Sequence, residues 1–323
     1  MRILITGGAG YIGSITNAIL RSQGVETVVF DSLKNGHRYA VRDTKLAVGD
    51  LTIKSDVDEV FAAEKFDAVI HFAALALAPE SMEKPFEYYQ NNVMGTLNLL
   101  EAMRKYGCKT LVFSSTCAVY GYPKSLPVTE EEKVAPESVY GSSKHIVEEI
   151  IAWYGRVYKL KFMNLRYFNA AGAMLDGSLG EDHSEETHII PVLLDVVSGK
   201  RKVFELYGKD YPTPDGTCIR DYIHVVDLAD AHVKAMEYLK KGGASASVNL
   251  GVGKGYSNLE VIASVSKVTG KKVPVEVKSR RAGDPASIYA DNTKAKKLLG
   301  WEPKHSDLET IVESAWKWHT RRQ

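Results

Sequence analysis

Tyr140 and Lys144 have the side-chain types and the spacing that proton transfer from an alcohol requires. Apolar residues three and four apart follow them, which predicts a helix that carries both side chains on one face. A free phenol has a pKa of about 10 and is a weak base at neutral pH, but an ammonium group held close favours the phenolate and lowers that pKa. Such a pair could accept a proton from a hydroxyl group while a hydride leaves the same carbon atom.

Three hydroxyl side chains precede this helix in the sequence. The apolar run 110–113 indicates a buried strand, and it ends in Ser114, Ser115 and Thr116. One of these hydroxyls could share the substrate proton with Tyr140. A Tyr-x-x-x-Lys pattern also arises by chance, and a tyrosine on an amphipathic helix usually serves packing, so the catalytic interpretation depends on the rest of the chain.

The first residues of the chain support it. A short apolar strand over 1–6 leads into Gly7, Gly10 and Gly13, and a helix follows to about residue 22. The glycines allow a tight turn and a close approach of the backbone to a pyrophosphate, which the N-terminus of the helix also attracts. Strand, glycine loop and helix together predict a dinucleotide-binding unit.

The next predicted strand, 27–30, ends in Asp31. Asp31 follows Gly13 by 18 positions, close to the roughly 20 expected of the carboxylate that binds the adenosine ribose. A carboxylate at this place repels a 2′-phosphate, so we expect NAD rather than NADP, although Lys34 and Arg38 are nearby cations.

Strands and helices alternate along the first half of the chain. Further strands are predicted over 46–48, 68–72, 109–114 and 162–166, and helices over 54–63, over 81–106 and from 140 onward. This alternation predicts an α/β fold with a doubly wound, Rossmann-like parallel sheet, in which ligands bind at the carboxyl ends of the strands. Residues predicted at such ends are the glycine loop, Asp31, Asp50, Ala73, Ser114 to Thr116 and Asn169.

Beyond residue 170 the pattern changes to loops rich in glycine, aspartate and proline. We therefore expect an NAD-binding domain over 1–170, to which segments near 218–250 return, and a smaller mixed α/β substrate lobe over 171–323. Arg220 and Arg281 in this lobe are candidates for clamping a second diphosphate, and exposed surface arginines are the alternative interpretation.

Composition excludes several classes of protein. A net charge of +1 with 25% charged residues gives no reason to expect a nucleic-acid or membrane-surface partner. Cys108, Cys117 and Cys218 are far apart and are expected to be reduced thiols in a cytoplasmic protein. No signal peptide, no apolar run of membrane-spanning length and no metal site is predicted.

With these residues in view, the chain resembles the extended short-chain dehydrogenase/reductases and, among them, the UDP-glucose (UDP-galactose) 4-epimerases. The resemblance covers nearly the whole length. The loop 210–217 followed by 220–224 is the most specific part. The matching segments are 6–13, 71–74, 88–93, 114–116, 140–144, 166–169, 180–183, 210–217, 220–224 and 281–284.

The resemblance implies an isomerase with a retained NAD that is reduced and reoxidised in each turnover. Tyr140 would take the proton from the sugar 4-hydroxyl as C4 gives up a hydride, Lys144 would bind the nicotinamide ribose and hold down the pKa of Tyr140, and Thr116 would bind the 4-oxygen. The resulting 4-keto sugar would swing about its diphosphate linkage and take the hydride back on its opposite face. UDP-glucose and UDP-galactose would thereby be interconverted in a homodimeric enzyme.

The resemblance also implies two sets of binding residues. Those implied for NAD are Gly7, Gly10, Tyr11, Ile12, Gly13, Asp31, Ser32, Asn35, Gly36, Asp50, Leu51, Phe72, Ala73, Ala74, Asn91, Ser114, Ser115, Tyr140, Lys144 and Tyr167. Those implied for the UDP-sugar are Thr116, Tyr140, Phe168, Asn169, His188, Ile189, Tyr207, Arg220, Tyr222, Arg281 and Asp284.

Departures from the family pattern leave alternatives open. Ala76 stands where many relatives carry a lysine near the cofactor, which affects the expected retention of NAD. Ile288 stands at a variable position that gates the 2-substituent of the sugar, so N-acetylhexosamine and pentose substrates remain alternatives. A dehydratase would need carboxylates where Cys117 and Ala118 follow Thr116. A non-catalytic NAD-sensing protein would usually have lost Tyr140 or Lys144.

Overall fold

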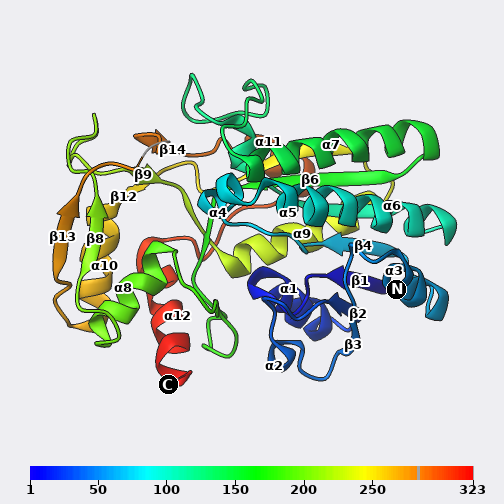
Figure 1. Ribbon diagram of the computed structural model, residues 1–323, viewed down its shortest axis with the longest axis horizontal. Helices are drawn as coiled ribbons and strands as arrows, with labels where there is room; N and C mark the ends of the chain where they lie inside the picture. Colours follow the sequence, from blue (N-terminus) through cyan, green and yellow to red (C-terminus); the bar gives the residue numbers. More distant parts are fainter. Residues whose placement is uncertain (282–283, 323) are drawn as a thin grey trace.

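A seven-stranded parallel sheet forms the centre of the computed structural model, which describes residues 1–281 and 284–322 (Figure 1). The strand order is β11-β6-β5-β4-β1-β2-β3, and every neighbouring pair is parallel. The strands are β1 (Arg2–Thr6), β2 (Glu26–Asp31), β3 (Lys45–Val48), β4 (Ala68–His71), β5 (Thr110–Thr116), β6 (Lys161–Tyr167) and β11 (Ala246–Leu250). The predicted doubly wound sheet is confirmed, and its order reverses between β1 and β4.

Helices cover both faces of the sheet because its strands are apolar on both sides. In β1, Ile3 and Ile5 belong to one hydrophobic cluster and Leu4 to the other. The first cluster is completed by α1 (Tyr11–Ser22), α9 (Val225–Lys240) and α11 (Thr293–Leu299), and the second by α3 (Lys54–Ala63), α6 (Gly95–Lys105) and α7 (Val139–Tyr158). A short helix, α2 (Arg38–Val41), follows β2. Thus α9 and β11, which come late in the chain, complete the central layers.

The single helix predicted over 81–106 is wrong. The segment forms α4 (Ala78–Glu83), α5 (Pro85–Tyr88), a π-helical turn η1 (Tyr89–Met94) and then α6. Lys84 has φ −125° and ψ 55°, because the residue before a proline is disfavoured in the helical region. The wider π turn points the amide of Asn92 into the protein, where it binds both backbone groups of Leu75 and the hydroxyl of Ser143 at 2.9–3.0 Å. The loop that carries Ala76 is therefore anchored by Asn92.

The second half of the chain builds smaller sheets and a separate helical layer, on the left in Figure 1. Two two-stranded sheets, one of which follows the end of β6, and one three-stranded sheet form among the described residues. The remaining elements are a 3-10 turn η2 (Cys117–Tyr120), β7 (Asn169–Ala171), α8 (Ile189–Val197), β8 (Phe204–Tyr207), β9 (Ile219–Arg220), β10 (Tyr222–His224), β12 (Tyr256–Ser257), α10 (Asn258–Thr269), β13 (Val275–Lys278), β14 (Ser287–Ile288) and α12 (Leu308–Arg321). Helices α8, α10 and α12 share one apolar core.

None of the helices in the described residues combines the length and the apolar composition that a membrane span requires.

Candidate active site

The loop between β1 and α1 is packed so tightly that two of its positions require glycine. Gly7 has a φ of +71°, and a Cβ atom there would lie 2.5 Å from the backbone nitrogen of Ala73. A Cβ atom on Gly13 would lie 2.2 Å from the carbonyl oxygen of Gly7. Only glycine accepts both the conformation and the close approach. Because α1 begins at Tyr11, its free backbone N–H groups lie at this turn, which suits a pyrophosphate.

Asp31 holds the glycine loop from the end of β2. Its carboxylate is buried and accepts hydrogen bonds from the backbone nitrogens of Ala9 at 3.0 Å and Leu33 at 2.8 Å. Lys34, one of the two cations near this strand end, forms an ion pair with Asp50 at 2.6 Å. This carboxylate-rich edge fits an adenosine ribose with a free 2′-hydroxyl better than one with a 2′-phosphate.

The other residues predicted to bind NAD also gather at the carboxyl ends of the strands. Several of them use their side chains within the protein; for example, Tyr11 donates to the carbonyl of Gly172 at 2.6 Å, Phe72 packs on the ring of His232, and Ser115 donates to Glu148. By strand end, the predicted residues are Gly7, Gly10, Tyr11, Ile12 and Gly13 after β1; Asp31, Ser32, Asn35 and Gly36 at β2; Asp50 and Leu51 after β3; Phe72, Ala73 and Ala74 after β4; Ser114 and Ser115 in β5; and Tyr167 in β6. Asn91 lies in η1 and hydrogen-bonds Asn92.

The proton-transfer candidates lie where β5 meets the start of α7. Tyr140, Lys144 and Thr116 are all buried. Ser138 caps α7 by accepting a hydrogen bond from the backbone nitrogen of Gly141, where a Cβ atom would lie 2.5 Å from the carbonyl oxygen of Ala118. This close approach brings the helix start against the chain that follows β5. The structure thus brings together the three side chains that the sequence separates.

The hydroxyls at 114–116 belong to β5 itself, not to a loop after it. They pair in register with residues 165–167 of β6. Lys144 reaches down to this strand and donates to the carbonyl oxygen of Ser114 at 2.9 Å, while the Ser114 hydroxyl bonds the phenol of Tyr167 at 2.8 Å.

The expected effect of Lys144 on the pKa of Tyr140 is not found among the groups of this chain. Burial, with a contribution from the phenol of Tyr167, raises the pKa of Tyr140 above its ordinary value, while the Thr116 hydroxyl acts in the opposite direction. Burial also lowers the pKa of Lys144, to about 7. The ammonium group of Lys144 donates to the strand carbonyl, and burial dominates the pKa of Tyr140 in the chain without NAD. The role expected of Lys144 with NAD bound stays a prediction. A phenolate at Tyr140 needs a further positive charge nearby.

A buried ion pair beneath these residues was missed by sequence reasoning. Glu148 lies one helical turn after Lys144, accepts hydrogen bonds from Arg166 at 2.9 and 3.2 Å, and accepts another from Ser115 at 2.6 Å. Arg166 also donates to Tyr120 at 2.9 Å. The network locks α7 to β5 and β6 at the level of the candidate site. The signal in the sequence was a carboxylate on the same helix face as Lys144.

His71 is a packing residue of β4. It is buried in β4, and its two ring nitrogens bond the hydroxyls of Thr6 at 2.7 Å and Thr96 at 2.9 Å. Burial lowers its pKa to about 3, so it stays neutral.

A cavity of about 520 Å³ opens between the second half of the chain and the end of β6. Among the predicted substrate-binding residues, those that line it are Asn169, His188, Ile189, Tyr207, Arg220, Tyr222, Arg281 and Asp284. Thr116, Tyr140 and Phe168 do not line it. Phe168 packs in a buried cluster with Ile288 and Tyr120, next to the proton-transfer candidates.

The two predicted arginines differ in how much of their hydrogen-bonding capacity is free. Arg220 donates to the carbonyl oxygens of Ile219 and Pro285 and lies 3.4 Å from the carboxylate of Asp284. The guanidinium of Arg281 lies 3.9 Å from the ring centre of Tyr207, so one face of the ring predicted to stack on uracil is covered by a cation.

Comparison with known proteins gives concordant matches. The model of the NAD dependent epimerase/dehydratase family matches residues 3–251. A UDP-glucose 4-epimerase from Lacticaseibacillus casei is 49% identical over 320 residues, which is 99% of this chain and 97% of the relative.

Two solved structures share the fold over nearly the full length. A UDP-glucose 4-epimerase from Brucella ovis in complex with NAD is 48% identical, with a TM-score of 0.96 and coverage of 98% of this chain and 97% of that chain. A UDP-glucose 4-epimerase from Bifidobacterium longum in complex with NAD⁺ and UDP is 39% identical, with a TM-score of 0.94 and coverage of 99% of this chain and 98% of that chain.

Proposed function

The chain belongs to the NAD dependent epimerase/dehydratase family, and we propose that it interconverts UDP-glucose and UDP-galactose by inverting C4 of the sugar. The observation that carries the proposal is the meeting of Tyr140, Lys144 and Thr116 at the same sheet edge as the glycine loop and Asp31. The residues proposed for proton transfer and for dinucleotide binding thus lie along the carboxyl edge of one sheet.

The residues present fit NAD. The glycine turn packs closely against the chain after β4, with the free backbone N–H groups of α1 at the turn, and Asp31 offers a buried carboxylate beside it. Bound NAD would supply a hydride acceptor and donor at C4 and a positive charge that favours the phenolate of Tyr140. Lys144 would hold the nicotinamide ribose from the side of Ser114.

The chain's own residues account for the remaining steps. Tyr140 accepts the proton of the 4-hydroxyl, and Thr116 holds the 4-oxygen in place. The 4-keto sugar then turns about its diphosphate linkage, which Arg220 and Arg281 retain in the cavity. Tyr140 returns the proton to the 4-oxygen after the sugar has turned, which completes the inversion.

Purified protein incubated with UDP-galactose and no added NAD tests this function. Formation of UDP-glucose supports both the activity and a retained cofactor. Formation only after NAD is added indicates weak retention around the loop that carries Ala76. If neither condition gives product, the proposal fails for these sugars. UDP-N-acetylglucosamine and UDP-pentoses are then tested, since Ile288 is buried against Phe168 where the sugar would enter.

Replacing Arg281 tests the diphosphate clamp. Arg281→Met should weaken UDP binding by roughly 10–150-fold, because a charge-assisted hydrogen bond contributes about 1.5–3 kcal/mol. The matched control is Arg280→Met, since Arg280 bonds the carboxylate of Asp210 at 2.7 Å instead of lining the cavity. Calorimetric titration with UDP measures both variants. Equal losses in the two would contradict the assignment.

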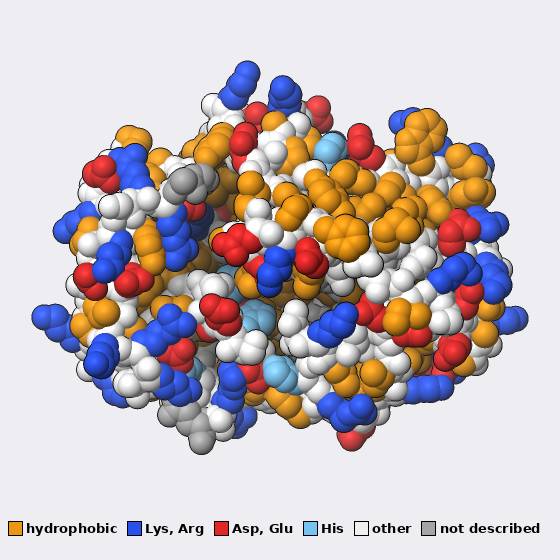
Figure 2. Space-filling model, viewed as in Figure 1, with side chains coloured by type: hydrophobic (Ala, Val, Ile, Leu, Met, Phe, Trp, Pro, Cys, Tyr) orange, Lys and Arg blue, Asp and Glu red, His pale blue; other side chains and the backbone are white. Residues whose placement is uncertain are grey.

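The homodimer is a further part of the proposal. An exposed apolar patch spans α4, α5, η1 and α7, and Figure 2 shows hydrophobic side chains gathered over these elements. Its most exposed members are Met82, Phe86, Met94, Trp153 and Val157. Contiguous apolar surface of this kind is typical of protein–protein contacts, and two copies of α7 could pair across a two-fold axis.

Trp153→Glu should convert the dimer to a monomer, because it buries a charge at the centre of the proposed contact. Sedimentation at micromolar concentration measures the change, with Val277→Glu as a control at an exposed apolar position on β13. A wild-type chain that already sediments as a monomer would remove the proposal.

We also propose that the protein acts in the cytoplasm. All three cysteines are free, and Cys108 and Cys218 are buried, as is usual where thiols stay reduced. Cell fractionation that finds the protein outside the cytoplasmic fraction would contradict this.

A further inference from the structure

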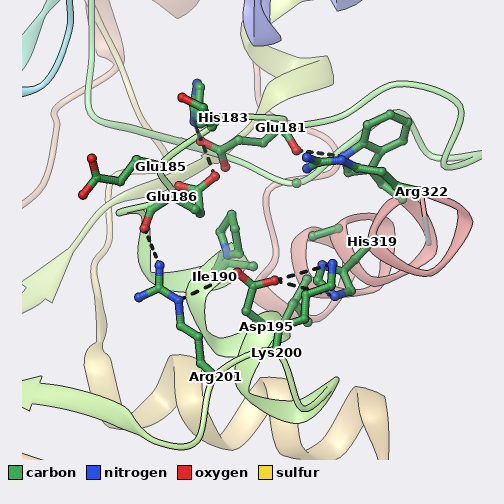
Figure 3. Close-up of a pocket in the computed structure, with 16 residues that line it drawn as sticks. Glu181, His183, Glu185, Glu186, Ile190, Asp195, Lys200, Arg201, His319 and Arg322 are labelled. Atoms are coloured by element: carbon green, nitrogen blue, oxygen red, sulfur yellow. Dashed lines mark hydrogen bonds and ion pairs between the residues drawn. The ribbon is translucent and has the colours of Figure 1, made fainter. Parts of the chain in front are cut away.

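Two imidazoles and two carboxylates gather in the segment that leads into α8. They belong to Glu181, His183, Glu186 and His188, and one potential ligand atom from each lies within 4.8 Å of all the others. Figure 3 shows Glu181, His183 and Glu186 turned toward one another above a cavity of about 320 Å³. None of the proton-transfer steps uses this cluster.

The spacing of the four atoms matches a metal site. A tetrahedral zinc ion with ligands at about 2.1 Å separates neighbouring ligand atoms by about 3.4 Å. Nδ1 of His183 lies 3.4 Å from Glu181 and 3.4 Å from Glu186, and Nδ1 of His188 lies 3.3 Å from Glu186. His188 and Glu181 are in direct contact, with Nδ1 and Oε1 2.7 Å apart. The two distances to Glu186 go to different oxygens of its carboxylate. Three of these four nitrogen–oxygen distances therefore already have about the length that a bound ion would impose.

The surrounding backbone holds the carboxylates in place. One oxygen of Glu186 accepts hydrogen bonds from the backbone nitrogens of Thr187 and His188, at 2.8 and 2.9 Å. The carbonyl of Glu186 is held by Arg201 and that of Glu181 by Trp318. Such outer contacts orient ligands and strengthen metal binding.

The cluster also occupies a defined place between two cavities. Glu181 and Glu186 line both the cavity of Figure 3 and the 520 Å³ cavity, while His183 lines only the first and His188 only the second. The side chain of Glu181 is only 6% exposed. A cation here would sit in the wall of the proposed nucleotide cavity.

We propose that Glu181, His183, Glu186 and His188 bind one divalent transition-metal ion per chain, with zinc as the best match. Two carboxylates neutralise the ion, and mixed nitrogen and oxygen ligands favour zinc over magnesium or calcium, which take oxygen ligands. The ion displaces the proton that His188 shares with Glu181 and any proton on Nδ1 of His183, so both imidazoles bind in the neutral form.

A matched pair of variants tests the site. Glu186→Gln removes one ligand charge, whereas Glu185→Gln makes the same change on the neighbouring residue, whose side chain points away from the cluster in Figure 3. Equilibrium dialysis of the full-length chain against zinc chloride, followed by metal analysis, should give one zinc per chain for wild type and Glu185→Gln. Glu186→Gln and His183→Gln should each bind at least about 100-fold more weakly.

Thermal unfolding of the same samples distinguishes a variant that has lost a metal ligand from a variant that no longer folds. Without zinc, the melting temperatures of Glu186→Gln and Glu185→Gln should agree. Zinc should raise the melting temperature of Glu185→Gln only, because a ligand that binds the native state stabilises it. A wild-type chain that takes up no zinc would overturn the proposal. So would zinc uptake that all the variants share, since that would indicate binding elsewhere in the protein.

Discussion

Tyr140→Phe should lower the turnover number by roughly 10²–10⁴-fold, the range assigned to general acid–base catalysis. The phenolic hydroxyl is the only group removed, and it is the group that accepts and returns the proton of the 4-hydroxyl. Tyr140 is buried among Thr116, Tyr167 and the start of α7, so phenylalanine fills the same space. The amount of NAD that copurifies should therefore stay the same.

The control for this variant lies on the same helix. Tyr154→Phe also removes a phenolic hydroxyl, one that donates to Glu101 of α6 near the C-terminal end of α7. Its turnover should remain within about twofold of wild type because no proton-transfer step involves it. Near-normal turnover in Tyr140→Phe would contradict the role assigned to Tyr140.

Glu148→Ala should lower the free energy of unfolding by about 3–5 kcal/mol, because it leaves the guanidinium of Arg166 buried without its partner. Both side chains are less than a tenth exposed. The variant also removes the acceptor of Ser115 in β5, so the strand that carries Thr116 loses a contact with α7.

Chemical denaturation measures this loss, with Glu149→Ala as the matched control. Glu149 is the next residue of α7, is 64% exposed and has only a 3.8 Å contact with His145, so its removal should cost about 0–1 kcal/mol. Similar losses in the two variants would show that helix propensity, not the buried pair, determines the effect.

The arrangement of the first half of the chain could be predicted because its signals are local. Apolar runs ending in glycine or polar residues indicated six of the seven strands of the central sheet, and parallel topology then placed Asp31 and Ser114 at one edge. The main error, the continuous helix over 81–106, came from giving the apolar periodicity more weight than Pro85. The resulting π turn, with Asn92 directed inward, has no periodic signature.

Features that depend on long-range packing were not predicted from the sequence. The partner of Glu148 is Arg166, on a strand that only the folded sheet brings beneath α7. The burial that raises the pKa of Tyr140 cannot be read from the spacing of Tyr140 and Lys144. The cluster of Glu181, His183, Glu186 and His188 lies in a segment without regular periodicity. The backbone contacts of that loop, which the sequence does not reveal, bring the four side chains together.

The central claim is that the hydride removed from C4 returns to the same carbon within one active site. UDP-galactose carrying deuterium at C4 tests this claim directly when it is converted in ordinary water by the purified protein. We expect UDP-glucose that retains the deuterium at C4, because the hydride never exchanges with solvent. Product that has lost the label to solvent would contradict the account, since inversion would then proceed by removal of a proton from carbon.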